Sequence, residues 1–192
     1  MENMLLTHYT HWRNIEAIRQ KGVLLCALSL MNKREQARLA GTKRDKSEQV
    51  SCGAILNDQQ PLNRVRLVFS DGARFDDFVR YLNGHVFFWP NNYAGEQARN
   101  NFRGKYRHPG HIGLRCPLAD LREKHDILYS PYNSGSMPRI PDKYPRHLNL
   151  FQPIEKRGDQ RLVEVVVRGK VYLPKNTKVE YENGEWRPFF RP

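Results

Sequence analysis

The chain has 192 residues, of which 39% are hydrophobic and 27% charged, enough to bury one core under a wetted surface. We therefore expect a single domain over residues 1–192. No apolar stretch reaches the roughly 18–20 residues that cross a bilayer, and the N-terminus lacks a basic start and a long apolar segment. These features disfavour membrane insertion and standard secretion, so we expect a cytoplasmic protein.

The charge balance points to a polyanionic partner. Lys and Arg outnumber Asp and Glu by 32 to 20, a formal net charge of +12, which produces a positive field around a domain of this size. Nine Tyr, nine Phe and three Trp supply surfaces on which bases can stack. Together they favour contact with nucleic acid or a nucleotide; the alternative is a basic protein whose charge serves only solubility.

Motifs of metal and hydrolase chemistry are missing from the sequence. Cys26, Cys52 and Cys116 are widely spaced with no Cys-x-x-Cys pair, so we read them as reduced thiols. Pro-Gly separates His108 from His111, which breaks helical geometry, and no cysteine lies near them. There is no glycine-rich phosphate loop and no Gly-x-Ser-x-Gly motif. We expect no metal site and no serine hydrolase.

The N-terminal part predicts a strand, a turn and a helix. Residues 4–9 can form a short strand, and Thr10 is a good N-cap for a helix that carries Trp12 on its apolar face and ends at Gly22. Residues 32–49 are dense in Lys, Arg, Glu and Gln, which indicates a solvated helix or a mobile basic segment.

The clearest helix and strand follow in the middle of the chain. Residues 71–82 place apolar side chains at i, i+3, i+4 and i+7, with Asp71 as the cap. Residues 85–89 are aromatic and β-branched and precede Pro90, which is typical of a central strand.

The C-terminal half completes an α+β pattern without internal repeats. Residues 104–115 show no assignable pattern. The other predicted elements are a polar helix over 91–103, a short helix over 117–124, a strand over 127–130, a strand over 161–168 and a hairpin over 178–190 that turns at Asn183-Gly184.

Glu164 is unusual because it interrupts an apolar strand. The period of two places it on the face of Leu162 and Val166, opposite Val163 and Val165. Burying a carboxylate without a partner costs several kcal/mol, so either this face opens into a cleft or a cation meets it. The residues leave two interpretations open, an edge-strand or ion-paired glutamate and a catalytic one.

A second cluster lies where the first strand meets the first helix. His8, Thr10 and, one helical turn later, Asn14 can converge there on an anionic ligand beside free helix N–H groups. In the alternative interpretation Thr10 is only an N-cap, His8 only a strand-end residue, and Asn14 contacts solvent.

The two ends of the chain resemble the DarT-type nucleic-acid ADP-ribosyltransferases. Residues 8–15, His-Tyr-Thr-His-Trp-Arg-Asn-Ile, followed by Gly-Val-Leu at 22–24, are similar to that family's His-x-Thr-His-x-x-Asn-Leu before a helix and a Gly-Leu pair. Residues 163–167, Val-Glu-Val-Val-Val, resemble the family's catalytic strand. The family's central Val-Pro-Phe-Tyr-Phe block is replaced here by His-Val-Phe-Phe-Trp at residues 85–89.

The middle of the chain is more similar to a group of uncharacterised bacterial proteins distantly related to that family. The shared segments are Asn-Asp-Gln-Gln-Pro at 57–61, Leu-Asn-Gly-His-Val-Phe-Phe-Trp at 82–89 and Ser-Pro-Tyr-Asn-Ser-Gly at 130–135. This second resemblance spans most of the chain.

The resemblance implies an ADP-ribosyltransferase-like split β-sandwich with peripheral helices and a cleft that takes NAD as a substrate. In such a site His8 and Thr10 hold the nicotinamide ribose and Asn14 stays close to it. The family's NAD-binding arginine lies after the first helix, where Arg34, Arg38 and Arg44 compete for the role; we favour Arg44.

The resemblance also assigns roles to Glu164 and to the loop before its strand. Glu164 would stabilise the oxocarbenium-like ribose or act as a general base toward the incoming nucleophile. The loop over residues 131–160 would recognise the target, unless it is a structural Ω-type excursion. Its predicted nucleic-acid contacts are Tyr132, Arg139, Lys143, Tyr144 and Arg146, with His147 of the same type.

Three functions follow as hypotheses. The first is an NAD-dependent mono-ADP-ribosyltransferase that modifies a base of DNA or RNA, a bacterial toxin or anti-phage effector with single-stranded nucleic acid as target and an antitoxin protein as possible partner. The second is the same transfer to a protein or a small molecule. The third is a non-enzymatic basic nucleic-acid-binding protein.

Overall fold

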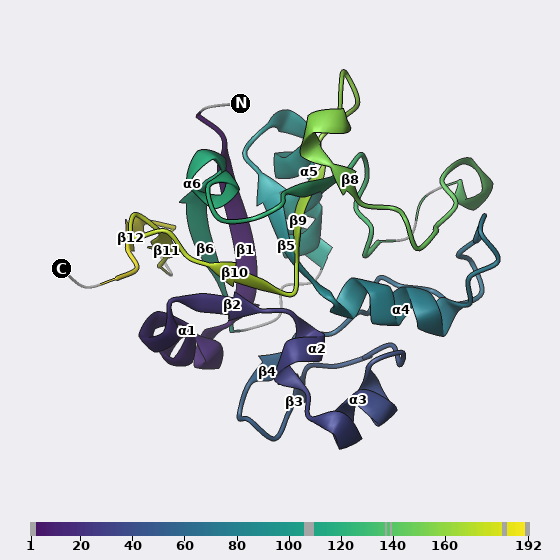
Figure 1. Ribbon diagram of the computed structural model, residues 1–192, viewed down its shortest axis with the longest axis horizontal. Helices are drawn as coiled ribbons and strands as arrows, with labels where there is room; N and C mark the ends of the chain where they lie inside the picture. Colours follow the sequence, from purple (N-terminus) through teal and green to yellow (C-terminus); the bar gives the residue numbers. More distant parts are fainter. Residues whose placement is uncertain (1–2, 106–109, 137, 139, 182–183, 191–192) are drawn as a thin grey trace.

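An eight-stranded antiparallel sheet forms the centre of the computed structural model, which describes residues 3–105, 110–136, 138, 140–181 and 184–190 (Figure 1). The strand order is β12-β11-β6-β1-β5-β9-β7-β8. The strands are β1 (Leu5–His11), β5 (His85–Pro90), β6 (His111–Pro117), β7 (Leu128–Ser130), β8 (Gln152–Pro153), β9 (Glu164–Arg168), β11 (Lys178–Glu180) and β12 (Trp186–Pro188).

Short helices and two small strand pairs surround this sheet (Figure 1). The small pairs are β2 (Val23–Leu25) with β10 (Lys170–Tyr172) and β3 (Glu48–Gln49) with β4 (Ile55–Leu56). The helices are α1 (Ile15–Lys21), α2 (Ala27–Leu30), α3 (Lys33–Leu39), α4 (Phe75–Asn83), α5 (Tyr93–Lys105) and α6 (Leu118–Arg122), with 3-10 turns η1 (Trp12–Asn14), η2 (Pro141–Lys143) and η3 (Ile154–Lys156). The fold class is α+β, as expected.

Each face of the sheet carries its own hydrophobic cluster. Because successive side chains of a strand point to opposite faces, Val165 and Val167 join one cluster and Val166 joins the other. The larger cluster includes Leu6, Val86, Phe88, Leu114 and Leu121, and the smaller one includes Phe75, Phe78, Val79, Leu82 and Phe151. The second cluster anchors α4 through the apolar spacing that its sequence predicts.

Several predicted elements are confirmed. The strand over 85–89 is central, with β1 on one side and β9 on the other, and helices occupy most of 71–82 and 91–103. The C-terminal hairpin forms from β11 and β12; Gly184 has φ 79°, a value that favours glycine, while Asn183 lies outside the described residues. The unassigned segment 104–115 contributes most of β6, which pairs with all of β1.

The predicted start of the first helix is wrong. Thr10 does not cap it, because β1 continues in register with β6 through Thr10 and His11. His11 instead caps the 3-10 turn η1, with its ring accepting the N–H of Arg13 at 3.2 Å, and α1 begins only after Asn14. Trp12 is 56% exposed rather than packed on an apolar face. The ladder with β6 outweighs the local capping preference.

Two further details differ from expectation. Asp71 does not cap α4, because its carboxylate accepts the N–H groups of Leu148 at 2.7 Å and Ala73 at 3.1 Å. Leu162 precedes β9 and packs in the cluster of Val165, not on the face of Val166. For the basic segment over 32–49, the helical alternative is confirmed by α3, most of whose residues are exposed or half-buried.

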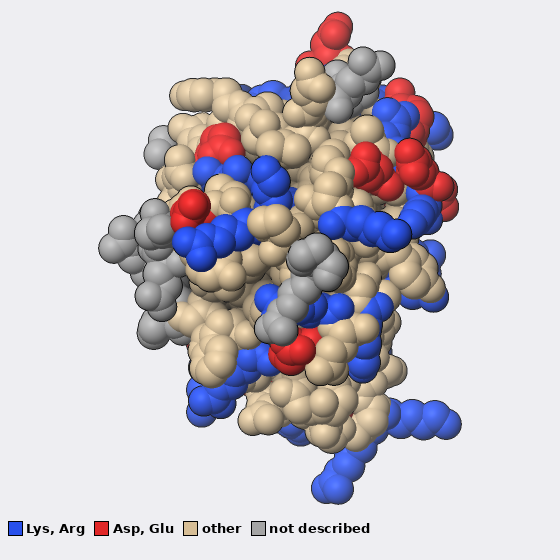
Figure 2. Space-filling view, turned by 90° about the vertical axis from the view of Figure 1, so that its left-hand side faces the viewer, with Lys and Arg blue, Asp and Glu red and all other residues tan. Residues whose placement is uncertain are grey.

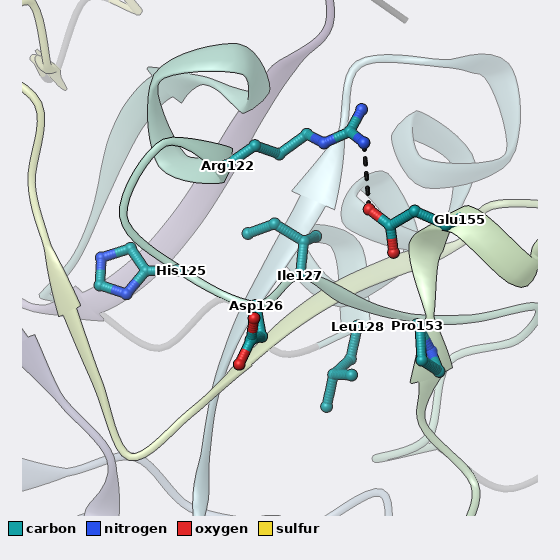
Figure 3. A pocket seen from close by; sticks show the side chains of 7 residues that line it. All are labelled: Arg122, His125, Asp126, Ile127, Leu128, Pro153 and Glu155. Carbon is teal, nitrogen blue, oxygen red and sulfur yellow. Dashed lines mark hydrogen bonds and ion pairs between the residues drawn. The ribbon is translucent and has the colours of Figure 1, made fainter.

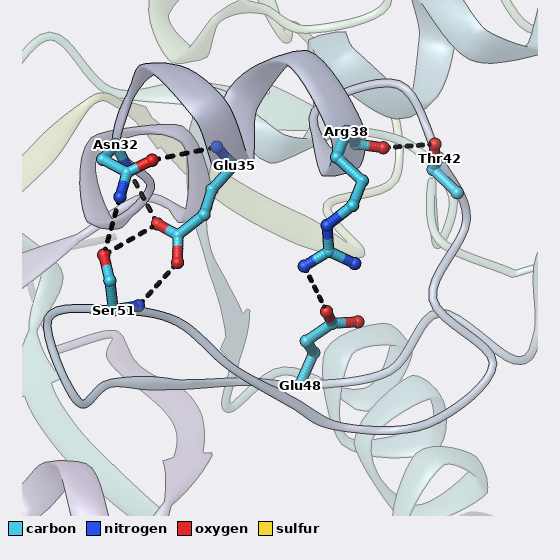
Figure 4. A network of polar contacts seen from close by, with 6 residues as sticks. All are labelled: Asn32, Glu35, Arg38, Thr42, Glu48 and Ser51. Carbon is cyan, nitrogen blue, oxygen red and sulfur yellow. Dashed lines mark hydrogen bonds and ion pairs between the residues drawn. The ribbon is translucent and has the colours of Figure 1, made fainter.

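Polar contacts hold the segment around α3, and one of them joins residues three positions apart, the spacing typical of a capping box. Asn32 and Glu35 form a capping box, and Glu35 also accepts the N–H of Ser51 at 2.6 Å (Figure 4). Arg38 pairs with Glu48 across the same loop at 2.7 Å. No helix in the described part of the chain is long and apolar enough to span a bilayer.

Candidate active site

Glu164 opens β9, an interior strand between β5 and β7. It pairs with Ser130 of β7 and is 3% exposed. The edge-strand interpretation is therefore wrong. Among the described residues, no Lys, Arg or His forms an ion pair with Glu164, so the ion-paired interpretation fails there as well.

The buried carboxyl of Glu164 has a pKa near neutral pH. Burial raises its pKa from an ordinary 4.5 to about 7, against the opposing effects of the Ser134 N–H, the Ser134 side chain and the charge of Arg146. The N–H of Ser134 donates to Oε2 at 2.9 Å. A carboxyl with such a pKa can accept or release a proton at physiological pH, which is the property required of a general base.

The pairing register shows which side chains share the face of Glu164. Thr7 pairs with Trp89 of β5 and with Arg115 of β6. Trp89 follows Phe88, which pairs with Val165 beside Glu164, so Trp89 lies in the row of Glu164. Arg115 was missed because β6 carries no clear strand pattern, and Thr7 and Trp89 were not singled out within the strands predicted over 4–9 and 85–89.

Aromatic and basic side chains continue this face over β6 and β12. Tyr9 lies against Trp89, with ring centroids 5.7 Å apart, and the Arg115 guanidinium sits 3.8 Å from the centroid of Trp186. A Cβ on Gly113 would come within 2.9 Å of Trp186 and 3.2 Å of Tyr9, so glycine is required for this close packing.

His8 lies where β1 and β5 stop pairing. The register puts it beside Phe88 and Leu114, on the face opposite Glu164, and its Nδ1 lies 2.8 Å from the carbonyl oxygen of Phe87. Nδ1 therefore carries the ring proton and donates it to this carbonyl, and Nε2 is free of a proton and can accept a hydrogen bond. Burial lowers the pKa of His8 to about 4, so the ring is neutral at pH 7.

Thr10 and Asn14 meet, as their spacing predicts, but their polar atoms serve the fold. The Asn14 amide donates to Thr10 Oγ1 at 3.0 Å and to the carbonyl of Ile55 at 2.8 Å, and its oxygen accepts the N–H of Ile55 at 2.8 Å. Asn14 thus joins η1 to β4. Its amide faces protein atoms rather than solvent.

Arg44 differs from the other two candidate arginines. Arg34 is exposed and Arg38 is exposed and ion-paired, whereas Arg44 is 7% exposed. Its Nε donates to the carbonyl of Asn57 at 2.9 Å and its Nη1 to the amide oxygen of Asn83 at 3.1 Å.

The charge of Arg44 is buried without an ion-pair partner among the described residues. Burial lowers its pKa to about 10, against the effects of Glu48 and Asp58. Two of its five N–H groups are used in the two bonds above, which leaves donors for an anion. A desolvated guanidinium favours a negatively charged ligand.

Asn57 connects Arg44 to β1 and was missed as a site residue. Its amide nitrogen donates to the carbonyl of Tyr9 at 3.2 Å, while its own carbonyl accepts from Arg44. The side-chain oxygen of Asn57 is buried and has no hydrogen-bond partner within the described part of the chain. The sequence signal was its position at the start of the shared 57–61 segment.

The predicted nucleic-acid contacts separate into two groups. Tyr144 is 41% exposed, with Lys143 Nζ 5.8 Å from its ring centroid, and both can reach a ligand. Arg146 cannot, since it is 1% exposed and its guanidinium lies 4.5 Å from the ring centroid of Tyr132. The expectation that Arg146 contacts phosphate is corrected by its burial. Arg139 lies outside the described residues.

A cavity of about 490 Å³ opens between α6, β7 and η3, away from every predicted site residue (Figure 3). Arg122 and Glu155 form an ion pair 3.0 Å long across it. The other lining residues are His125, Asp126, Ile127, Leu128 and Pro153.

Comparisons with known proteins give one family and one fold likeness. The model of a family described as "Family of unknown function (DUF7002)" matches residues 4–176. No curated protein matches. Two solved structures of DarT from Thermus sp. 2.9 are similar, in complex with NAD+ (11% identity, TM-score 0.43, 95% of this chain and 85% of that chain covered) and with ADP-ribosylated ssDNA (12%, 0.43, 95% and 84%).

Proposed function

This chain belongs to the family of unknown function DUF7002, and we propose that it transfers ADP-ribose from NAD to a base of single-stranded nucleic acid. The observation that carries the proposal is Glu164: a carboxyl on an interior strand, 3% exposed, with a pKa raised to about 7. The sequence resemblance at residues 8–24 and 163–167 supplies the reaction class. We also propose that the chain forms a single ADP-ribosyltransferase-like domain. Its proposed role is that of a toxin or anti-phage effector with an antitoxin protein as partner.

Glu164 is proposed as the catalytic residue. Breaking the bond between nicotinamide and ribose builds positive charge on the ribose, and an ionised carboxylate stabilises that charge. Because the Ser134 N–H holds Oε2, Oε1 is the oxygen that would bind a ribose hydroxyl or take the proton of the incoming base. Proton transfer of this kind contributes roughly 10²–10⁴-fold to a rate.

The N-terminal residues and Arg44 are proposed to hold NAD. The remaining N–H groups of Arg44 suit the pyrophosphate, whose charge would neutralise the buried guanidinium. His8 is neutral, and although it lies on the face opposite Glu164 it sits where β1 and β5 stop pairing, so Nε2 is proposed to accept from a ribose hydroxyl at that point. Thr10 and Asn14 are proposed to shape this end of the site through their mutual hydrogen bond.

The nucleic-acid part of the proposal rests on charge and exposed aromatics. The net charge is +12, and Figure 2 shows several groups of Lys and Arg side chains on the face that carries the C-terminal strands, with groups of Asp and Glu among them. Lys143 and Tyr144 offer phosphate contact and base stacking on the loop before β9. A single strand is favoured because its bases are free to reach the ribose.

The proposal is tested by incubating the protein with labelled NAD and a panel of single-stranded DNA, RNA, proteins and nucleosides, with mass spectrometry of each acceptor. We expect label on a DNA or RNA base with the wild type and none with Glu164→Gln. The control is Glu16→Gln, which changes an exposed glutamate on α1 and should transfer normally. Label on protein or nucleoside alone changes the acceptor class, and no label together with no NAD-induced thermal shift overturns the enzyme assignment.

A further inference from the structure

Arg146 is an arginine almost completely removed from solvent, at 1% exposure, in the loop before β9. Its backbone is fixed first: its N–H donates to the carbonyl of Val68 at 2.8 Å, and its carbonyl accepts the N–H of Ser70 at 3.1 Å. The side chain therefore projects from an anchored point into the loop.

The guanidinium grips the tight turn that contains Ser134. Its Nη2 donates to the carbonyls of Asn133 at 3.2 Å and Ser136 at 2.7 Å, one on each side of Ser134. Its Nη1 donates to the carbonyl of Tyr144 at 3.2 Å. Three carbonyl oxygens thus solvate a charge that forms no ion pair with any described residue.

The ring of Tyr132 packs against the guanidinium of Arg146. Its ring centroid lies 4.5 Å from the Arg146 guanidinium carbon, and its hydroxyl donates to the carbonyl of Pro145 at 3.3 Å. The ring and the three carbonyls hold the planar guanidinium in one orientation. A lysine could supply the charge, but its one nitrogen cannot replace the two guanidinium nitrogens, of which Nη2 holds the turn while Nη1 holds the carbonyl of Tyr144.

The turn held by Arg146 places the N–H of Ser134 next to the carboxylate of Glu164. Ser134 is fully buried, and its N–H donates to Glu164 Oε2 at 2.9 Å. Asn133 and Ser136, whose carbonyls accept from Arg146, lie on either side of Ser134. Any change in the position of the turn changes the distance between the Ser134 N–H and the carboxylate.

We propose that Arg146 is a positioning residue for Glu164, whose fork holds the 133–136 turn so that the Ser134 N–H donates to the carboxylate. The inference rests on the proposed function only in treating Glu164 as the reacting acid. Arg146 touches no substrate. It acts through the turn.

The electrostatic consequence has a definite sign. The Ser134 N–H stabilises the ionised form of Glu164 and so opposes the rise in pKa that burial causes. The charged and titratable groups that act on Glu164 are Arg146, whose charge works in the same direction, and Tyr132, which is neutral at pH 7. Moving the Ser134 N–H away while Glu164 stays buried therefore raises the pKa of Glu164 further.

The test is a carbon-13 NMR titration of the Glu164 carboxyl, assigned with Glu164→Gln, in the wild type and in Arg146→Lys. Losing a charge-assisted hydrogen bond should move the midpoint upward by about 1 pH unit or more. Arg161→Lys, the same substitution at an exposed arginine three residues before Glu164, should leave it in place. An unchanged midpoint in a folded Arg146→Lys variant would show that charge alone matters and overturn the proposal.

A second readout uses the wild type and so does not depend on a variant that folds. The Ser134 amide proton should shift with pH at the same midpoint as the Glu164 carboxyl, because its hydrogen bond strengthens as the acceptor ionises. An amide that does not titrate contradicts the proposal. Neither titration needs NAD, so loss of the proposed enzyme activity and loss of this positioning role give different results.

Discussion

Glu164 is a carboxyl whose burial makes the stability of the whole protein depend on pH. Its pKa is 4.5 when solvated and about 7 in the fold, so between these values the folded state holds a proton that the unfolded state has lost. Stability therefore falls as pH rises through this window, by at most about 3 kcal/mol.

Glu164→Gln should remove this dependence. We expect the free energy of unfolding of the variant, relative to the wild type, to increase from about pH 4.5 to about pH 7, as measured by urea unfolding across that range. Glu16→Gln, at an exposed position, should track the wild type. A constant difference between Glu164→Gln and the wild type would mean that Glu164 is ionised throughout, with no raised pKa.

His8 should show the opposite slope. Its pKa is lowered from 6.5 to about 4 by burial, so below pH 6.5 the unfolded state takes up a proton that the folded state refuses. Stability then falls as pH decreases from about 6.5 to about 4. His8→Asn should be less sensitive to acid than the wild type in the same urea experiments, and equal acid sensitivity would show that His8 protonates freely in the fold.

At the scale of elements, Asn14 joins the start of α1 to β4 by two hydrogen bonds with Ile55 and to β1 by one with Thr10. Asn14→Ala leaves the N–H and carbonyl of Ile55 without their partner, at a cost of about 1–3 kcal/mol. We expect a lower melting temperature, measured by circular dichroism. Asn149→Ala, at an exposed loop position, should leave the melting temperature unchanged. If Asn14→Ala melts at the same temperature as the wild type, the structural role of Asn14 is contradicted.

Thr10 separates the structural from the ligand-binding role of the same element. Thr10→Val keeps the shape of the strand side chain and removes only the hydroxyl that accepts from Asn14. If NAD is held at this end of the site, calorimetry should show weaker NAD binding, with a drop in melting temperature smaller than that of Asn14→Ala. Unchanged NAD affinity would leave Thr10 a purely structural residue.

At the scale of the whole molecule, we expect the positively charged protein to bind single-stranded nucleic acid through the loop that carries Lys143 and Tyr144. Lys143→Gln should lower the magnitude of the log–log salt slope by about 0.7, and Tyr144→Ala should weaken binding by about 1–3 kcal/mol with the slope nearly unchanged. Fluorescence anisotropy with a short labelled oligonucleotide over a salt series measures both effects.

A second lysine and tyrosine pair provides the matched control for this surface. Lys170 Nζ lies 4.9 Å from the ring centroid of Tyr172, which is 44% exposed, a geometry close to that of Lys143 and Tyr144. Lys170→Gln and Tyr172→Ala should change oligonucleotide binding little. Equal effects from both pairs would show that the protein binds through diffuse charge, without a preferred loop.

The elements with strong local patterns were predictable from the sequence. Helix α4 and strand β5 follow from apolar spacing and aromatic content, and the α3 capping box follows from residue types three apart. The β6 strand was not predictable, because Gly113 and Arg115 break its pattern for reasons that lie in the neighbouring side chains of Trp186 and Tyr9.

The sequence by itself determined the α+β class, the positive charge and the anomaly of a glutamate inside an apolar strand. Only the tertiary structure decided that β9 is interior, so that Glu164 is buried and its pKa rises, and that Arg146 is withdrawn from solvent to hold a turn. The reason is physical. Local patterns reflect the backbone preference of each segment, whereas burial depends on which strands and loops, distant in the chain, come to lie against it.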